Sequence, residues 1–142
     1  MLIPYRDQYL TWDDFEERYF LTEEALKTNG MDIRARASRN KANAPEYVIN
    51  GFVRVVSNHI YNFIHEHSAN NCYQDKIIST IPSMRKIIYK ALITQAIFVY
   101  KNGDWTLSPN EWERANYISP QARADLNTTI TELGRSILYI GV

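Results

Sequence analysis

The feature that most constrains the fold is a long helical period of apolar residues in the middle of the chain. In the segment 45–67, PEYVINGFVRVVSNHIYNFIHEH, apolar residues return every three or four positions. One helical face then carries Phe52, Val56, Ile60, Phe63 and Ile64. Pro45 suits the first helical position, where a missing N–H costs nothing, and the turn-rich run SANNCYQ predicts the end of the helix. A helix with one apolar face must pack against other elements, so this segment predicts a helical core.

Two further helices are predicted after it. One opens at Thr80 and Pro82 and stops at Asn102–Gly103, and its apolar residues cover more than half of its circumference, which is typical of a central helix. The other starts at Ser119–Pro120, a cap followed by proline. Its apolar face is predicted to hold Ala122, Leu126, Ile130, Leu133 and Ile137.

The first part of the chain gives weaker signals. Thr11 is placed to cap a short helix over WDDFEERYF, and Thr22 another over EEALKTN that Gly30 closes. Residues 31–44 have weak periodicity and are compatible with a linker or with a helix of low stability. Between the last two long helices, the segment GDWTLSPNEWERANYI predicts a long ordered loop anchored by Trp105, Trp112 and Tyr117.

Together these signals predict an all-α protein, a small bundle of about four to five helices with a long C-terminal loop and an apolar C-terminal tail. Glycine and proline are scarce, five each, which disfavours a turn-rich β fold. The 142 residues fit a single domain, with 1–44 as a charged N-terminal extension and 45–142 as the core helices, the last helix and the tail.

Charge, cysteine content and hydropathy exclude several classes of protein. The formal net charge is zero, whereas a free-standing nucleic-acid binder usually has a basic excess. The single cysteine cannot form an internal disulfide. No secretion signal is evident, and the longest apolar segment, KIIYKALITQAIFVYK, is too short and too polar to span a bilayer. We therefore expect a soluble protein made in a cytoplasm, with no membrane partner.

Charge is also divided along the chain. The charged residues of 1–24 are seven acids and two arginines. Those of 27–41 are five basic residues and one acid, with Arg34, Arg36 and Arg39 at the centre of the segment. One interpretation is two solvated faces that offset each other. The other is that the two segments contact different neighbours, and the basic segment also leaves phosphate contact open.

The stretch SNHIYNFIHEH is the most obvious place for chemistry. Histidines that share a metal on a helix lie three or four residues apart, but His59, His65 and His67 are spaced by six and two. His59 and His67 share a side at a separation of roughly 12 Å. A frayed helix end that joined His65, His67 and Cys72 would still lack a spacing signature. We expect His59 and His67 to bond to neighbours and His65 to be solvated.

Other catalytic patterns are missing from the sequence. It contains no phosphate-binding glycine loop and no nucleophile elbow, and Cys72 has no visible third group to orient a Cys–His pair. The acids Asp13, Asp14, Glu16 and Glu17 are better explained by a helix N-terminus than by a hard cation. We expect no enzyme activity, no catalytic residue, no metal and no cofactor.

Three segments resemble the head–tail connector proteins (adaptor or head-completion proteins) of long-tailed bacteriophages. They are the early helix FVRVVSNHIYNFIHEH, the core helix that ends at an NGD turn, MRKIIYKALITQAIFVYKNGD, and the ending ISPQARADLNTTITELGRSILYIGV. The resemblance spans roughly residues 45–142, and residues 22–44 look like an extension to the family's pattern.

The resemblance implies a virion structural protein without an enzymatic step. Such proteins form a homo-oligomeric ring, commonly of twelve subunits, beneath the portal protein in the virion neck, after assembly in the host cytoplasm. The ring extends the channel through which genomic DNA leaves, without specific DNA binding, and it contacts the next neck, stopper or tail protein.

Candidate contact residues follow from composition and from the loop and tail. They are Arg34, Arg36, Arg39, Trp105, Trp112, Tyr117, Leu138, Tyr139, Ile140 and Val142. The apolar tail either folds back on its own bundle or marks a contact site. Two alternatives to the connector are kept: a small helical DNA-binding or regulatory protein, and an enzyme with a cryptic site.

Overall fold

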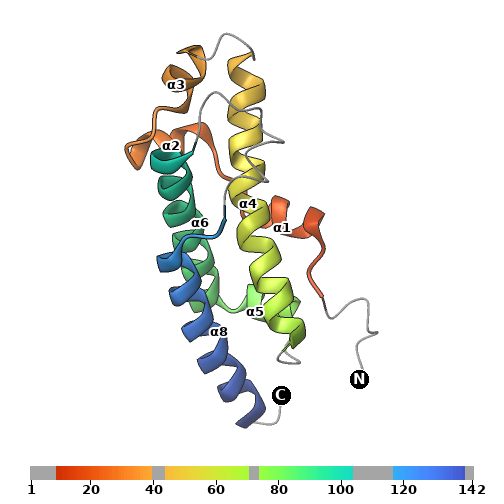
Figure 1. Ribbon diagram of the computed structural model, residues 1–142. Coiled ribbons are helices and arrows are strands. Elements are labelled where there is room, and N and C mark those ends of the chain that lie inside the picture. Colours follow the sequence, from red (N-terminus) through yellow and green to blue (C-terminus); the bar gives the residue numbers. More distant parts are fainter. Residues whose placement is uncertain (1–8, 40–43, 71–73, 104–116, 140–142) are drawn as a thin grey trace.

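Within the residues described by the structure, a computed structural model, the fold is a bundle of three long helices with four short helices around it (Figure 1). The structure describes residues 9–39, 44–70, 74–103 and 117–139, with side chains for all of these except 39, 69–70 and 133–139. These ranges are all-helical and contain no strand, which confirms the predicted fold class. The helices are α1 (Trp12–Arg18), α2 (Glu23–Thr28), α3 (Ile33–Arg39), α4 (Pro45–Asn70), α5 (Asp75–Thr80), α6 (Pro82–Asn102) and α8 (Pro120–Tyr139).

The described ranges hold seven helices, more than the four to five predicted, because two short helices add to the five that the sequence signals. Helix α3 lies in the segment 31–44, which was compatible with either a linker or a weak helix. Helix α5 was not predicted, and it changes the start of α6. Thr80 belongs to α5, where its hydroxyl donates to the carbonyl of Ile77 at 2.7 Å, so α6 begins at Pro82 with Ile81 as its cap.

The predicted starts of α1, α2, α4 and α8 are confirmed. The hydroxyls of Thr11, Thr22 and Ser119 each accept a backbone N–H from the first turn of α1, α2 and α8. Gly30 follows α2 with φ 81°, a backbone conformation that glycine adopts at little cost. These signals lie within a few residues of one another, which is why sequence alone located them.

The core lies between the three long helices, and α6 packs against α4, α5 and α8. On α4, Phe52, Val56, Ile60 and Ile64 are fully buried, while Phe63 is half-buried against the same cluster. Each fully buried side chain of this size stabilises the fold by roughly 1.5–3 kcal/mol. The predicted apolar stripe is therefore the face of α4 that α6 and α8 cover.

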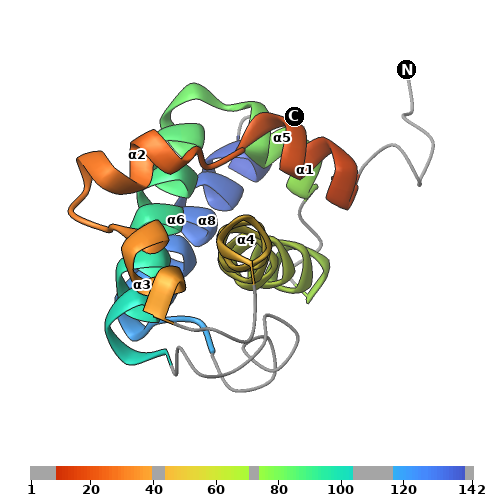
Figure 2. The same ribbon diagram turned by 90° about the horizontal axis from the view of Figure 1, so that it is seen from above.

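Side chains from before residue 45 enter the same core. Leu10, Phe15, Leu26 and Ile33 are each at most 1% exposed and belong to the cluster that the long helices form. Seen from above, α1, α2 and α3 lie around the outside of the long helices (Figure 2). This region is rich in charged residues, but its apolar side chains pack on α4, α5 and α6.

Helix α1 is fastened to α5 by polar contacts between residues far apart in sequence. The backbone N–H of Leu10 donates to Asp75 Oδ1 at 2.7 Å, and the Tyr19 hydroxyl donates to the carbonyl of Ser79 at 2.9 Å. The Arg18 guanidinium donates to Ser79 Oγ at 3.3 Å. Burial raises the pKa of the Tyr19 phenol to about 12, so this hydroxyl keeps its proton at neutral pH.

Candidate functional site

The predicted contact residues fall into three groups. Arg34, Arg36 and Tyr117 have described side chains. A second group lies in α3 and α8, but its side chains are outside the described set: Arg39, Leu138 and Tyr139. A third group lies outside the described residues altogether: Trp105, Trp112, Ile140 and Val142. The single cysteine, Cys72, is outside them as well. Since α8 runs to Tyr139, the first residues of the predicted apolar tail are helical.

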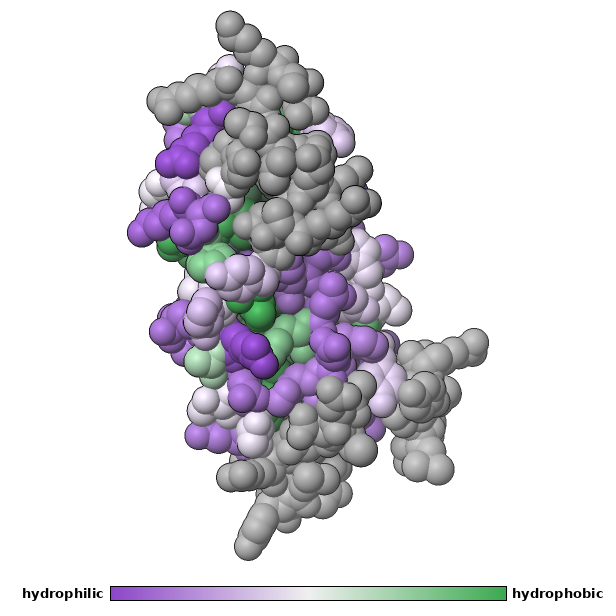
Figure 3. Space-filling model, in the orientation of Figure 1, coloured by the Kyte–Doolittle hydropathy of each residue, from purple (hydrophilic) through white to green (hydrophobic). Residues whose placement is uncertain are grey.

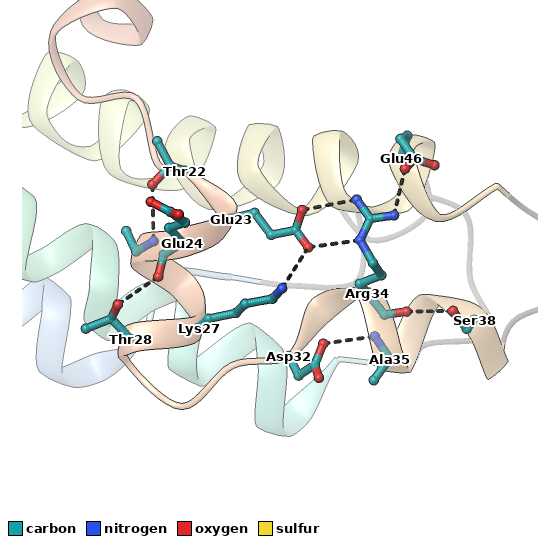
Figure 4. A network of polar contacts seen from close by, with 11 residues as sticks. Thr22, Glu23, Glu24, Lys27, Thr28, Asp32, Arg34, Ala35, Ser38 and Glu46 are labelled. Atoms are coloured by element: carbon teal, nitrogen blue, oxygen red, sulfur yellow. Dashed lines mark hydrogen bonds and ion pairs between the residues drawn. The ribbon is translucent and has the colours of Figure 1, made fainter.

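Arg34 is the centre of an ion-pair network that joins three helices (Figure 4). Its Nε and Nη2 donate to the two carboxylate oxygens of Glu23 on α2, both at 3.1 Å, and its Nη1 donates to Glu46 on α4 at 2.6 Å. Lys27 approaches Glu23 at 3.8 Å. The hydrogen bonds from Arg34 lower the pKa of both carboxyl groups, so the two acids are ionised acceptors at neutral pH.

Arg36 also has partners within the chain. Its Nη1 donates to the carbonyl of Tyr100 at 3.1 Å, and its guanidinium carbon lies 4.2 Å from the centre of the Tyr100 ring. Arg36 therefore ties α3 to the end of α6. Because Arg34 and Arg36 support the fold, reversing their charge perturbs the fold as well as any interface, and their role in subunit contact stays a prediction.

The three histidines of α4 contact three separate partners. His59 Nδ1 lies 3.3 Å from Gln95 Nε2, and His67 stacks on Phe63 with ring centres 5.6 Å apart. His65 was expected to be solvated, which is wrong in part: its side chain is 44% exposed, but its Nδ1 lies 2.7 Å from Asp75 Oδ2. Its partner sits on α5, the helix that the sequence did not predict.

The carboxylate of Asp75 is fully buried and fully engaged. One oxygen accepts the backbone N–H of Leu10, and the other meets His65. The Tyr61 hydroxyl donates to the carbonyl of Leu10 at 2.8 Å, so both polar backbone groups of Leu10 are held. A buried carboxylate needs such partners. The contact between His65 and Asp75 therefore has a structural role, which is to hold residues 9–10 against the bundle.

Within the described ranges, no group of three or more His, Cys, Asp or Glu side chains is arranged to hold a metal ion. Asp13 and Asp14 lie in the first turn of α1, where the helix dipole favours carboxylates. Burial lowers the pKa of His67, which favours its neutral form. Among the described helices, none is long and apolar enough to cross a membrane.

A buried glutamine joins α6 to the start of α8. Gln95 Oε1 accepts the backbone N–H of Ser119 at 2.7 Å, and its Nε2 donates to the carbonyl of Tyr117 at 2.9 Å. The side chain is fully buried. The two bonds fix the backbone just before α8, and they place the exposed Tyr117 ring against Phe98, with ring centres 5.3 Å apart.

Among the described residues, a groove of about 380 Å³ lies between α1 and α4 and is called here the α1–α4 groove. Its apolar lining comes from Trp12, Phe20, Leu21, Ile49 and Val53. Its polar lining comes from Glu16, Thr22, Glu23, Arg34, Glu46, Asn50, Arg54 and Ser57. Sequence reasoning missed the groove, because it exists only when α1 and the residues after it pack on α4.

Phe20 forms the outer lip of this groove and is 61% exposed. On its other side it borders a shallow hollow that Asp13, Glu16 and Glu17 complete. An aromatic ring this exposed, set between an apolar floor and carboxylates, is a feature of contact surfaces. Since Glu23 and Glu46 are held ionised, the groove offers apolar contact and hydrogen-bond acceptors, which suits binding.

Comparison with protein-family models, with curated proteins and with solved structures gave no match.

Proposed function

We propose that this protein is a virion structural protein, a head–tail connector of the adaptor or head-completion kind. In this proposal copies of the chain form a ring, with twelve subunits as the expected number, beneath the portal. The ring extends the DNA channel and joins the capsid to the next neck, stopper or tail protein. The segment 103–118, which the sequence predicts as a loop, and the segment 136–142, which it predicts as an apolar tail, are contact segments in this proposal.

One observation carries the proposal: large aromatic side chains stand exposed on, or directly beside, helices whose other faces are well buried. The exposed fractions are 61% for Phe20, 48% for Tyr47, 42% for Tyr89 and 63% for Tyr117. The first borders the α1–α4 groove, and the other three lie on α4, on α6 and just before α8. Amphipathic aromatics of this kind are favoured where proteins pack against each other.

Among the residues coloured in Figure 3, most of this face is hydrophilic, and hydrophobic surface shows in small areas near its middle. Small apolar areas within polar surface suit subunits that fold alone and then associate. The three segments that carry the resemblance also lie on α4, α6 and α8, the helices that form the centre of the bundle. This arrangement supports the proposal, since the resemblance then covers one continuous packing unit.

The test is the mass and shape of the particle that the protein forms with its portal. The purified protein, of 16.6 kDa per chain, is mixed with the portal oligomer of the same virus and examined by mass photometry and electron microscopy. We expect a ring of about twelve copies, a number that comes from the resemblance, coaxial with the portal. A protein that stays monomeric beside the portal, under all salt conditions tried, contradicts the proposal.

The alternative of a DNA-binding or regulatory protein is tested with the same preparation. Binding to duplex DNA through phosphate contacts falls steeply as salt rises. Salt-dependent binding of the monomer to duplex DNA, without any association with a portal, would favour that alternative.

A further inference from the structure

We propose that the α1–α4 groove is one half of the contact between neighbouring subunits, and that its occupant is the outer face of α6 from a second copy of the chain. This inference rests on the proposed ring and names the surfaces that meet in it. The occupant is called here the basic face of α6, defined as Lys86, Tyr89 and Lys90, all of which are exposed.

The two helices have opposite charge. Helix α1 holds four acids and one arginine, and all its acids fall within the run DDFEE. Helix α6 holds one arginine and three lysines and has no acid over its 21 residues. The neutral net charge of the chain therefore combines an acidic surface beside the groove, at Asp13, Glu16 and Glu17, with a basic surface on α6.

Within the part of the chain that the structure describes, the charges on these two surfaces have no partner. Among the described residues, none of Asp13, Glu16, Glu17, Lys86 and Lys90 forms an ion pair or a side-chain hydrogen bond. Other charged residues nearby are paired, since Arg34 forms ion pairs with Glu23 and Glu46. The acids beside Phe20 and the lysines of α6 are thus available to a second molecule.

Each surface has an aromatic ring at its centre. Phe20 is 61% exposed between the groove and its acidic neighbours, and Tyr89 is 42% exposed between Lys86 and Lys90. Apolar contact at the centre with complementary charge around it is the usual anatomy of a specific interface. The apolar floor at Trp12, Ile49 and Val53 receives Tyr89 in this arrangement, and Glu16 and Glu17 meet the lysines.

The two surfaces also lie apart on the subunit. Among the described residues, those that line the groove and the hollow beside Phe20 lie between Trp12 and Ser57, and none of them comes from α6. Unlike patches on different sides of one subunit make a heterologous contact, the kind that closes into rings.

The experiment is a charge exchange between the two surfaces. The first variant carries Glu16→Lys with Glu17→Lys, the second carries Lys86→Glu with Lys90→Glu, and the third carries all four changes. Self-association of each is measured by analytical ultracentrifugation and on the portal by electron microscopy, after circular dichroism and thermal unfolding have shown that it folds. The control variant, Glu24→Lys with Glu66→Lys, makes the same change in charge at exposed positions on α2 and α4.

We expect the first and second variants to associate at least roughly tenfold more weakly than the natural protein, because each places like charges opposite each other. An equimolar mixture of the two restores association, since every contact then pairs opposite charges, and so does the fourfold variant alone. The control variant associates like the natural protein. Replacing Tyr89 with Ser weakens association without changing its salt dependence.

Two outcomes overturn this inference and leave the connector proposal standing. One is a ring on the portal that both charge variants form as well as the natural protein does. The other is loss of portal binding by the first variant while its self-association is unchanged, which would assign the groove to the portal. A natural protein that forms no ring at all overturns both, whereas head-to-tail oligomers without portal binding overturn only the connector proposal.

Discussion

Replacing Gln95 with Leu tests the contact that fixes the start of α8. Leu nearly matches the volume of Gln, so the change leaves little cavity. It removes the two hydrogen bonds to the backbone before α8 and the contact of Gln95 Nε2 with His59 Nδ1 at 3.3 Å. It leaves the buried N–H of Ser119 without its acceptor and the carbonyl of Tyr117 without its donor. An unsatisfied buried backbone group costs about 1–3 kcal/mol, and a lost bond at a partly exposed carbonyl about 0.5–1.5 kcal/mol.

The free energy of unfolding should therefore fall by about 2–4 kcal/mol, from a total that for domains of this size is about 5–15 kcal/mol. Urea unfolding, followed by circular dichroism at 222 nm and by tryptophan fluorescence, measures the change. Hydrogen exchange provides a local readout, because the Ser119 amide should lose protection before the amides in the middle of α6.

The matched control is Gln121→Leu on the exposed face of α8. Gln121 donates to Asp125 Oδ1 at 2.9 Å, an exposed contact one helical turn apart. Such a pair contributes only about 0.2–0.5 kcal/mol. If Gln95→Leu and Gln121→Leu have the same small effect, the buried amide does not hold α8 and the reasoning fails.

Three further predictions concern charge and pH. The raised pKa of Tyr19 means that the unfolded chain releases this proton near pH 10 and the folded chain only near pH 12, so stability should fall as pH rises above about 10. Alkaline urea titrations of Tyr19→Phe should lack this fall, and an unchanged profile would contradict it. Because the pKa of His67 is lowered in the folded chain, the unfolded chain binds this proton at a higher pH than the folded chain does. Stability should therefore fall as pH drops through and below 6.5. The His67→Gln variant should show a flatter curve of stability against pH in this range, and the change should release no metal. Arg34→Gln should lower the melting temperature by removing the links to Glu23 and Glu46, and the loss should shrink as salt is added; a loss independent of salt would argue against an electrostatic origin. In acid, the lowered pKa values of Glu23 and Glu46 should make the natural protein lose stability below about pH 4.5, and the variant should lose less.

The parts of the fold that sequence predicted are those whose causes are local. Thr22 caps α2 and Gly30 ends it through residues three to five positions away, and Phe52, Val56 and Ile60 mark a face by their spacing alone. The starts of the long periodic helices were located for the same reason, whereas α8 continues into the predicted apolar tail, to Tyr139.

What sequence missed depends on residues that meet only in the folded chain. Nothing near Asp75 marks it as buried, because its partners are Leu10 and His65. The α1–α4 groove likewise needs α1 to pack on α4. The basic face of α6 was present in the sequence, but a search for apolar periodicity passes over the lysines that interrupt it.

The bonds between α1 and α5 have a consequence for the order of events during synthesis. Leu10 finds its acceptor 65 residues later, and Tyr19 finds its acceptor 60 residues later. A ribosome adds residues at roughly 5–20 per second, so α1 waits several seconds for the helix that secures it. The groove that α1 shapes is therefore finished late, after α4 and α5 have left the ribosome. In the proposed ring this groove is a docking surface, so a nascent chain lacks a complete docking surface while other copies are being made on the same mRNA. The delay favours folding of each chain before it associates with another.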